Sequence, residues 1–350
     1  MLKRPSGASP VHTRRPRYAG NNPRGFHDKY KELNAERYPS EVEKVLASGK
    51  TPAGTHRPIM VEEVLDCLRP RAGEVAVDCT LGGGGHARAI LERVQPGGRL
   101  IGLDVDPLEL PRTEARLRAE GFGPGAFVAR HVNFAGLLRV LAAEGVASVD
   151  VILADLGVSS MQLDNPDRGF SHRGQGPLDM RMNPTCGESA SHMLARVSEA
   201  ELERLLTENA DEPHAHLIAG LLKQQPIETT QAVDRLVRAG LTRAFPNLTK
   251  PDLKLSVRRT LQALRIAVND EFSALDWLLR TLPQRLAPGG RVVVLTFHSG
   301  EDRRVKKAFQ AGYRAGVYAD VANTVIRATM EETRANRRAS SAKLRWAVRA

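Results

Sequence analysis

Hydrophobic positions recur along the first half of the chain in two alternating spacings. Short apolar runs typical of buried strands occupy residues 73–80, 99–106, 126–134 and 149–157. Stretches with apolar residues three or four apart, the spacing of an amphipathic helix, occupy residues 59–68, 87–94 and roughly 108–120. Strands that alternate with helices of this length predict a parallel sheet with right-handed crossovers. We therefore predict a doubly wound α/β fold.

The alternation stops after residue 157. Residues 158 to about 255 contain helical stretches and loops but no apolar run typical of a strand. From Leu261 to Leu286 apolar residues step by three or four, which predicts one long helix. Residues 286–297 then predict a fifth strand, and two short extended stretches, around 317–329 and 342–348, are expected to complete the sheet.

This break divides the chain into parts. Residues 56–160 and 256–350 are predicted to form the α/β domain, and residues 161–255 to form a helical domain inserted into it. Residues 1–55 are rich in Pro, Gly and basic side chains, a composition that predicts a disordered extension.

Composition narrows the class of protein. The chain has 350 residues, 41% of them hydrophobic, and no apolar run approaches the ~20 residues that span a bilayer. The first residues lack the apolar segment of a secretory signal. The three cysteines form no CxxC pair, so we expect reduced thiols. Together these features predict a cytoplasmic protein with no membrane segment.

The net charge of +11 lies at the two ends of the chain. Residues 1–26 and 334–350 each carry six Lys or Arg and no acid, which leaves 39 basic and 40 acidic residues between them. Basic tails of this kind favour a polyanion, because phosphate contacts release counterions. A merely solubilising role for the tails fits the composition equally well.

A glycine-rich stretch, DCTLGGGGHA at 78–87, follows the first predicted strand. Such a loop leaves backbone N–H groups free and lets a ligand approach the main chain at the carboxyl end of the sheet. It lacks the GxxxxGK[ST] pattern of a triphosphate-binding loop, and its GxGxxA match (Gly82, Gly84, Ala87) is compatible with a dinucleotide. Asp104 ends the second strand, where a carboxylate can accept both ribose hydroxyls of NAD or of S-adenosylmethionine.

The end of the fourth strand separates these two cofactors. DLGVSS (155–160) places the carboxylate of Asp155 before a tight polar turn. Methyl transfer to an exocyclic amine needs an acceptor for the N–H groups, because the lone pair of the cytosine amine is delocalised into the ring. Hydride transfer has no matching need, so Asp155 is the candidate catalytic residue and S-adenosylmethionine is favoured. Asp104 and Asp155 also fit ordinary turn or strand-end caps.

Longer motifs carry a resemblance to a known family. In chain order they are HRPIM (56–60), DCTLGGGGH (78–86), LDVDP (103–107), DLGVSS with QLD (155–164), RGFSH (168–172), GPLDMRM (176–182), RTLQALRIAVNDE (259–271), PGGRVVVLTFHSGEDRRVK (288–306) and SAKLR (341–345). With these motifs the chain resembles the MraW/RsmH family of S-adenosylmethionine-dependent ribosomal RNA methyltransferases.

The resemblance implies a class I (Rossmann-like) methyltransferase domain with an inserted helical domain. It also implies methylation of the N4 amine of a decoding-region cytidine in the 16S rRNA of the small ribosomal subunit. The cofactor contacts it implies are Gly84, Gly85, His86, Asp104, Phe134, Asp155 and Gln162. Candidate phosphate contacts are Arg181, Arg258 and Arg259, for each of which a salt bridge within the protein is the alternative. The His, Cys and acidic positions show no metal-ligand spacing, so we expect no metal.

Some positions depart from the family pattern or leave alternatives open. Gly300 and Leu261 differ from the usual residues, and so do TENADEP (207–213) and LKLSV (253–257), which puts the details of RNA contact in doubt. His56 and His298 either orient substrate or are structural, and Ser299 is expected to cap a helix.

Other functions remain open at this stage. They are a methyltransferase acting on DNA or on a membrane-associated partner, a non-catalytic ribosome assembly factor, and a nucleotide-binding oxidoreductase.

Overall fold

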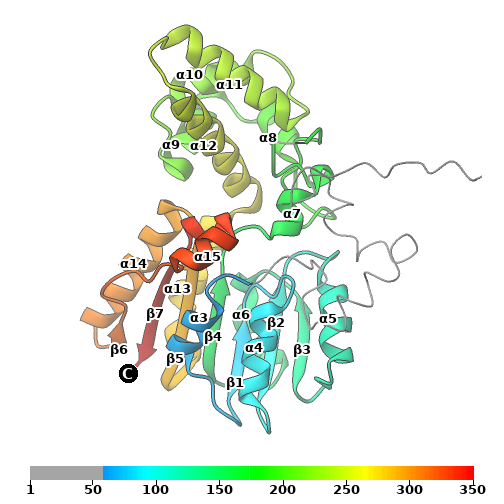
Figure 1. Cartoon of the computed structure of the whole chain (residues 1–350), viewed down its shortest axis with the longest axis vertical. Helices are drawn as coiled ribbons and strands as arrows, with labels where there is room; N and C mark the ends of the chain where they lie inside the picture. The colour runs from blue at the N-terminus through cyan, green and yellow to red at the C-terminus, as the bar shows by residue number, and fades with distance from the viewer. Residues whose placement is uncertain (1–57, 173) are drawn as a thin grey trace, which may run out of the picture.

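A seven-stranded sheet forms the centre of the α/β part (Figure 1). The computed structural model describes residues 58–172 and 174–350, so His56 and the extension at 1–55 lie outside the described residues. The strands are β1 (Val75–Asp78), β2 (Arg99–Asp104), β3 (Phe127–His131), β4 (Val149–Asp155), β5 (Leu286–Thr296), β6 (Tyr318–Val321) and β7 (Lys343–Arg349).

The strand order is β3-β2-β1-β4-β5-β7-β6, with β1 to β5 parallel. β7 runs antiparallel to β5, and β6 antiparallel to β7. The predicted doubly wound α/β sheet is confirmed, and so are the two late strands that complete it.

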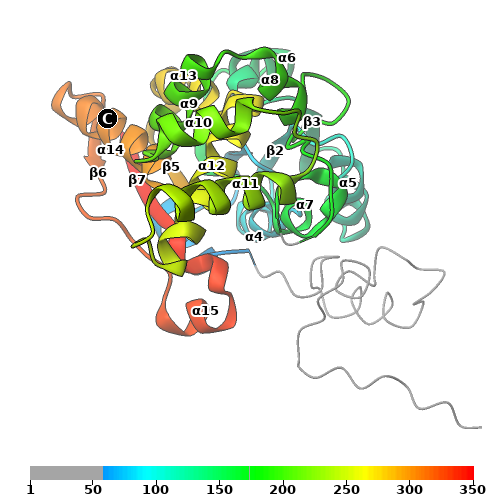
Figure 2. The same ribbon diagram turned by 90° about the horizontal axis from the view of Figure 1, so that it is seen from above.

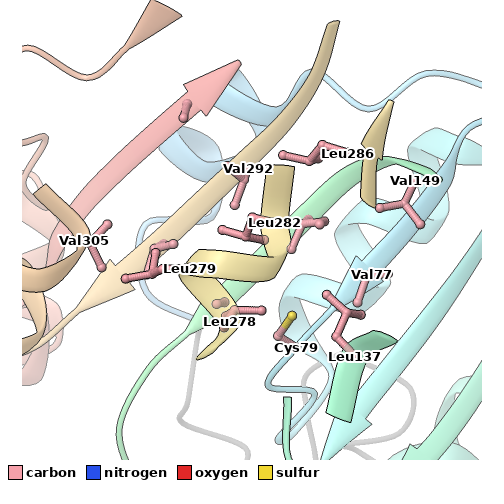
Figure 3. Close-up of a cluster of buried hydrophobic side chains, with 14 of the residues drawn as sticks. Val77, Cys79, Leu137, Val149, Leu278, Leu279, Leu282, Leu286, Val292 and Val305 are labelled. Atoms are coloured by element: carbon pink, nitrogen blue, oxygen red, sulfur yellow. The ribbon is translucent and has the colours of Figure 1, made fainter. Parts of the chain in front are cut away.

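Helices cover both faces of this sheet, because successive strand residues point to opposite sides. The helices are α3 (Val61–Leu68), α4 (Gly85–Val94), α5 (Leu110–Ala119), α6 (Leu137–Ala143), α13 (Glu271–Arg285) and α14 (Ser299–Arg314). On one face Val77 packs with Leu278 and Leu282 of α13 (Figure 3). On the other face Ala76 packs with Ile90 of α4. Each face thus has its own buried core.

A separate helical part lies above the carboxyl ends of the strands (Figures 1 and 2). Its helices are α7 (Ser160–Asp164), α8 (Ala190–Arg196), α9 (Glu199–Ala210), α10 (Ala215–Lys223), α11 (Thr230–Ala244) and α12 (Lys250–Asn269). Leu202, Ile218, Val237 and Leu264 belong to its own core. Between residues 158 and 255, apart from residue 173, the structure has no strand beyond one isolated bridge. The expected helical insertion is therefore present.

The prediction of one long helix from Leu261 to Leu286 is wrong. Asp270 has a left-handed backbone (φ 49°) and separates α12 from α13. Leu261 packs in the helical core, whereas Leu278 packs against the sheet. Because the apolar spacing continues through the break, the pattern did not reveal it. The domain boundary at residue 256 stays a prediction, and this packing favours a boundary near Asp270.

The last segment of the chain returns to the same region. α15 (Met330–Ala335) and the short 3-10 helix η4 (Arg337–Ser341) lie between β6 and β7 in the chain. Glu332 Oε1 accepts a hydrogen bond from the backbone N–H of Met60 at 2.8 Å, which ties this segment to the start of α3. None of the helices in the described ranges combines the length and apolarity that crossing a bilayer requires.

Candidate functional site

A cavity of about 640 Å³ lies at the carboxyl ends of the strands, beneath the helical part. Its size is that of a small-molecule site, ~300–1,000 Å³. Its walls include the glycine loop, the ends of β2 and β4, helix α12 and the segment η4. The predicted cofactor residues Gly84, Gly85, His86, Asp104, Phe134, Asp155 and Gln162 all line it. The structure therefore brings the seven together, while their roles stay predictions.

Glycine is required for different reasons at the positions of the four-glycine loop. A Cβ on Gly84 (φ 68°) would lie 2.7 Å from Thr113 Cγ2, and one on Gly85 would lie 2.6 Å from Pro58 Cγ. A Cβ on Gly83 would meet nothing within 4 Å. Internal packing thus accounts for Gly84 and Gly85, and only Gly83 of these three has an open side where a ligand can approach the main chain.

Asp104 holds the loop beneath it. Its Oδ2 accepts a hydrogen bond from Gly82 N at 2.6 Å, and its Oδ1 accepts one from Asp106 N at 2.8 Å. Burial raises the pKa of Asp104, while these two bonds oppose the rise. A carboxylate has about four acceptor sites, so lone pairs remain for two ribose hydroxyls. The residue therefore fits both the sugar and the loop.

A buried ion pair lies beside Asp104, and the sequence patterns did not predict it. Asp106 is only 1% exposed, and its Oδ2 accepts hydrogen bonds from Arg168 Nη1 and Gln162 Nε2, both at 2.8 Å. Arg168 Nη2 also donates to the carbonyl oxygen of Met182 at 2.7 Å. The LDVDP and RGFSH motifs contain both charged residues, but nothing in the spacing shows that they meet.

Gln162 contributes to the shape of the site as well as lining it. Its Oε1 accepts from Ser159 N at 2.8 Å, completing a capping box at the start of α7, and its Nε2 is bound to Asp106. Both ends of its amide are therefore already used by the protein. Phe134, half-buried at the start of the 3-10 helix η2 (Phe134–Gly136), presents an aromatic ring to the same cavity.

Asp155 and His86 face each other at the end of β4. His86 is buried, its Nε2 lies 2.9 Å from Ile59 O, and its Nδ1 lies 3.7 Å from Asp155 Oδ2. Burial lowers the pKa of His86. Burial and then the charge of Glu301 raise the pKa of Asp155 to about 7. Asp155 Oδ1 is buried and has no hydrogen-bond partner within the protein, so it can accept a hydrogen bond from a ligand.

A charged group lies in the neighbouring wall of the cavity. The guanidinium of Arg265 donates two hydrogen bonds to the carboxylate of Glu271, Nε to Oε1 at 2.8 Å and Nη2 to Oε2 at 2.9 Å. Glu271, His298 and Glu301 offer ligand atoms within 4.8 Å of one another, the one such group among the residues searched. Because Arg265 already supplies positive charge there, the group fits an internal ion network. The absence of a metal stays a prediction.

His298 rather than Ser299 caps α14, so the expected Ser299 cap is wrong. His298 Nδ1 accepts from Glu301 N at 3.4 Å, and Glu301 Oε2 accepts in return from His298 N at 3.4 Å and Phe297 N at 2.8 Å. The imidazole takes the place that Ser usually fills at a helix start.

The three candidate phosphate contacts do not lie together. Arg258 is exposed on α12 and lines the cavity. Arg259, its half-buried neighbour, does not line it. Arg181 also lies outside the cavity wall, where its Nε and Nη2 bind the two oxygens of Asp179 at 2.8 and 2.7 Å. Arg258 therefore has the placement most suited to a substrate contact.

Comparison with known proteins identifies relatives over almost the whole chain. Residues 53–350 match the MraW methylase family. The chain is 46% identical to "Ribosomal RNA small subunit methyltransferase H 1" of Lachnoclostridium phytofermentans over 346 residues, covering 97% of this chain and 94% of the relative. It is also 46% identical to "Ribosomal RNA small subunit methyltransferase H 2" of Alkaliphilus metalliredigens, covering 96% and 97%. The resemblance seen in the motifs is confirmed.

Solved structures with a similar arrangement are more distant. One is a putative methyltransferase from Streptococcus mutans in complex with SAH, at 10% identity and a TM-score of 0.38, covering 84% of this chain and 100% of that chain. Another is an S-adenosylmethionine-dependent O-methyltransferase from Thermotoga maritima, at 9% identity and a TM-score of 0.37, covering 83% and 64%.

Proposed function

Because the chain belongs to the MraW methylase family, we propose that it is an S-adenosylmethionine-dependent methyltransferase of ribosomal RNA. Its substrate is the N4 amine of a decoding-region cytidine in 16S rRNA, within the small ribosomal subunit, and it acts in the cytoplasm. The names of relatives that match nearly the full chain specify small-subunit ribosomal RNA, and they support that part of the proposal. The observation that carries the proposal is one cavity that joins Gly83, Asp104 and the unpartnered acceptor of Asp155.

The residues of the cavity fit this cofactor. Gly83 leaves the main chain open, Asp104 keeps lone pairs for two hydroxyls, and Phe134 offers a ring against which an adenine can lie. Gly84, Gly85 and the backbone of His86 lie next to that opening, at the start of α4. Gln162 fixes Asp106 behind Asp104. When bound, S-adenosylmethionine supplies a methyl group on a positively charged sulfur.

Asp155 acts on the amine. Its carboxylate accepts a hydrogen bond from an N–H of the cytosine amine. This bond orients the amine and increases the electron density on its nitrogen. A pKa of about 7 keeps a substantial share of the group in the accepting form at neutral pH. The same carboxylate can take up the amine proton once the N–C bond has formed. Direct in-line transfer of this kind needs no covalent enzyme intermediate.

The RNA side of the site involves the helical part. Arg258 at the cavity wall is placed to bind a phosphate near the target nucleotide. A cytidine must leave the base stack to enter the cavity, because its amine is otherwise inaccessible. The basic ends of the chain add phosphate attraction that does not depend on sequence.

Nucleoside mass spectrometry of small-subunit RNA from cells with and without the protein tests this function. We expect N4-methylated cytidine to disappear without it and to return with the purified protein and S-adenosylmethionine. Asp104→Ala is expected to weaken binding of S-adenosylhomocysteine by about 1.5–3 kcal/mol, because hydrogen bonds to a charged acceptor are lost. RNA with unchanged modification would refute the activity. Restored growth with an inactive Asp155→Asn variant would favour the assembly-factor alternative.

A further inference from the structure

Two residues of the cavity wall each contain a side-chain atom that is buried without a hydrogen-bond partner. The described residues contain seven such side-chain atoms: Arg99 Nε, Arg116 Nε, Asp155 Oδ1, Glu212 Oε2, Arg285 Nε, His298 Nε2 and Arg304 Nε. Of their residues, only Asp155 and His298 line the cavity. A buried polar group without a partner costs free energy that a bound ligand can recover. These two atoms therefore mark where polar groups of a substrate belong.

Asp155 and His298 come from adjacent strands. Asp155 ends β4 and is paired with Leu295 of β5, and His298 follows Leu295 by three residues. Glu301 lies near both: its Oε1 is 3.1 Å from His298 Nε2, and its charge contributes to the raised pKa of Asp155. The two residues thus lie at the carboxyl edge of the sheet, and both line the cavity.

One of the two atoms is a donor and the other an acceptor. His298 Nδ1 accepts the N–H of Glu301, which places the imidazole proton on Nε2. Glu301 Oε1 is close to that nitrogen but is not aligned for a hydrogen bond. Asp155 Oδ1 can accept. Two residues of the cavity wall therefore supply an N–H donor and a carboxylate acceptor.

We infer that His298 is a specificity-determining residue that donates its Nε2–H to the ring N3 of the target cytosine, while Asp155 accepts the adjacent N4 amine. This inference rests on the proposed function. Cytosine presents a donor and an acceptor side by side on this edge. Uracil has a carbonyl oxygen and a ring N–H there. Its carbonyl oxygen would face the carboxylate of Asp155, and its ring N–H would face the N–H of His298, so neither hydrogen bond could form. The pair therefore selects cytosine over uracil.

A purely structural role for His298 explains only half of the side chain. The capping box uses Nδ1, whereas Nε2 has no hydrogen bond and only the ion-pair contact with Glu301 Oε1 at 3.1 Å. A metal would compete with Arg265, whose guanidinium already binds both oxygens of Glu271. The far nitrogen, in a side chain only 10% exposed, thus has an ion-pair contact with Glu301 but no hydrogen bond within the fold.

Two substitutions separate the roles of the two ring nitrogens. In His298→Asn the amide can replace Nδ1 as the helix cap but is too short to reach the position of Nε2. In His298→Gln the amide nitrogen can reach that position, whereas the cap is weakened. We therefore expect His298→Asn to keep the melting temperature and lose the base contact, and His298→Gln to show the opposite pattern.

The readout is methylation of small ribosomal subunits whose target nucleotide is either cytidine or 3-deazacytidine, which keeps the amine but lacks N3. The wild-type protein is expected to show kcat/KM about 10- to 100-fold lower on 3-deazacytidine, the cost of one lost buried hydrogen bond. His298→Asn should lose a similar factor on cytidine and less than about twofold more on 3-deazacytidine. His298→Gln should keep part of the discrimination.

Binding of S-adenosylhomocysteine by each variant separates the two possible failures. If His298→Asn distinguishes the two nucleotides as strongly as the wild-type protein does, the inference is overturned while the proposed function stands. The same holds if the wild-type protein methylates both nucleotides equally. If the wild-type protein binds S-adenosylhomocysteine but methylates neither, the proposed function fails, and this inference fails with it.

Discussion

The two sides of the cavity are built in different ways. On the side of the α/β part, side chains hold backbone atoms close by in the fold: Asp104 binds Gly82 N, and Thr113 donates to Gly82 O at 2.6 Å. On the side that α12 of the helical part forms with the start of α13, charged side chains bind one another, as Arg265 and Glu271 do. The first side owes its shape to backbone conformation, and the second to charges whose strength depends on burial.

Removing the buried Asp106 carboxylate should produce the largest effect, because its ion pair with Arg168 joins the two sides. Asp106→Ala leaves Arg168, which is 8% exposed, without its charge partner. We expect the free energy of unfolding, measured with urea, to fall by about 3–5 kcal/mol. Asp167→Ala, at an exposed position next to Arg168, is the matched control and should change it by less than ~0.5 kcal/mol. Equal effects of the two would show that the buried pair does not join the two sides.

The glycine loop offers a contrast between packing and ligand access. Gly84→Ala adds a methyl group against Thr113 at a left-handed backbone position, so unfolding should become easier by about 2–4 kcal/mol. Gly83→Ala adds the same methyl group where nothing lies within 4 Å. We expect it to keep stability and to weaken S-adenosylhomocysteine binding, measured by calorimetry. A Gly83→Ala variant with unchanged affinity would place the ligand elsewhere.

The raised pKa of Asp155 predicts a specific dependence of stability on pH. Burial, and then the charge of Glu301, raise it from 3.8 to about 7. Between these values the unfolded chain has lost the proton and the folded chain keeps it, so stability falls as pH rises. Asp155→Asn removes this loss. The variant should therefore gain roughly 4 kcal/mol relative to the wild-type protein between pH 4 and pH 8.

Asp78 does not confuse that comparison. Its pKa is also raised, to about 6, mainly by burial, and the charge of Asp155 is one of the smaller causes. The residue is present in both proteins, so only this smaller part of its contribution differs between them. Urea titrations at several pH values measure the difference. Parallel stability curves for the two proteins would show that Asp155 is not held in an environment that disfavours its charge.

The sequence predicted the sheet and the glycine loop well because both depend on neighbouring residues. Strand and helix spacing is local, and the loop is a continuous motif between β1 and α4. The pairing of Asp106 with Arg168 joins residues 62 positions apart, and no spacing rule connects them. The spacing of apolar residues did not predict the break at Asp270, because this spacing continues from α12 into α13. The two helices nevertheless pack in two different cores. Among the candidate cofactor residues, Asp104 and Asp155 were predicted from their places at strand ends, and the full set of seven came from the resemblance to the family.

The weakest expected effect belongs to a second ion pair between distant segments, Arg338 of η4 with Asp164 of α7. Its Nη2–Oδ1 distance of 2.7 Å almost equals that of the Asp106–Arg168 pair, but its side chains are 30% and 21% exposed. Water screens such a pair, so a double-mutant cycle with Arg338→Ala and Asp164→Ala should give a coupling of about 0.5–1 kcal/mol. The coupling should shrink further in 1 M salt. A coupling as large as that of the buried pair would mean that distance, rather than burial, sets the strength of these contacts.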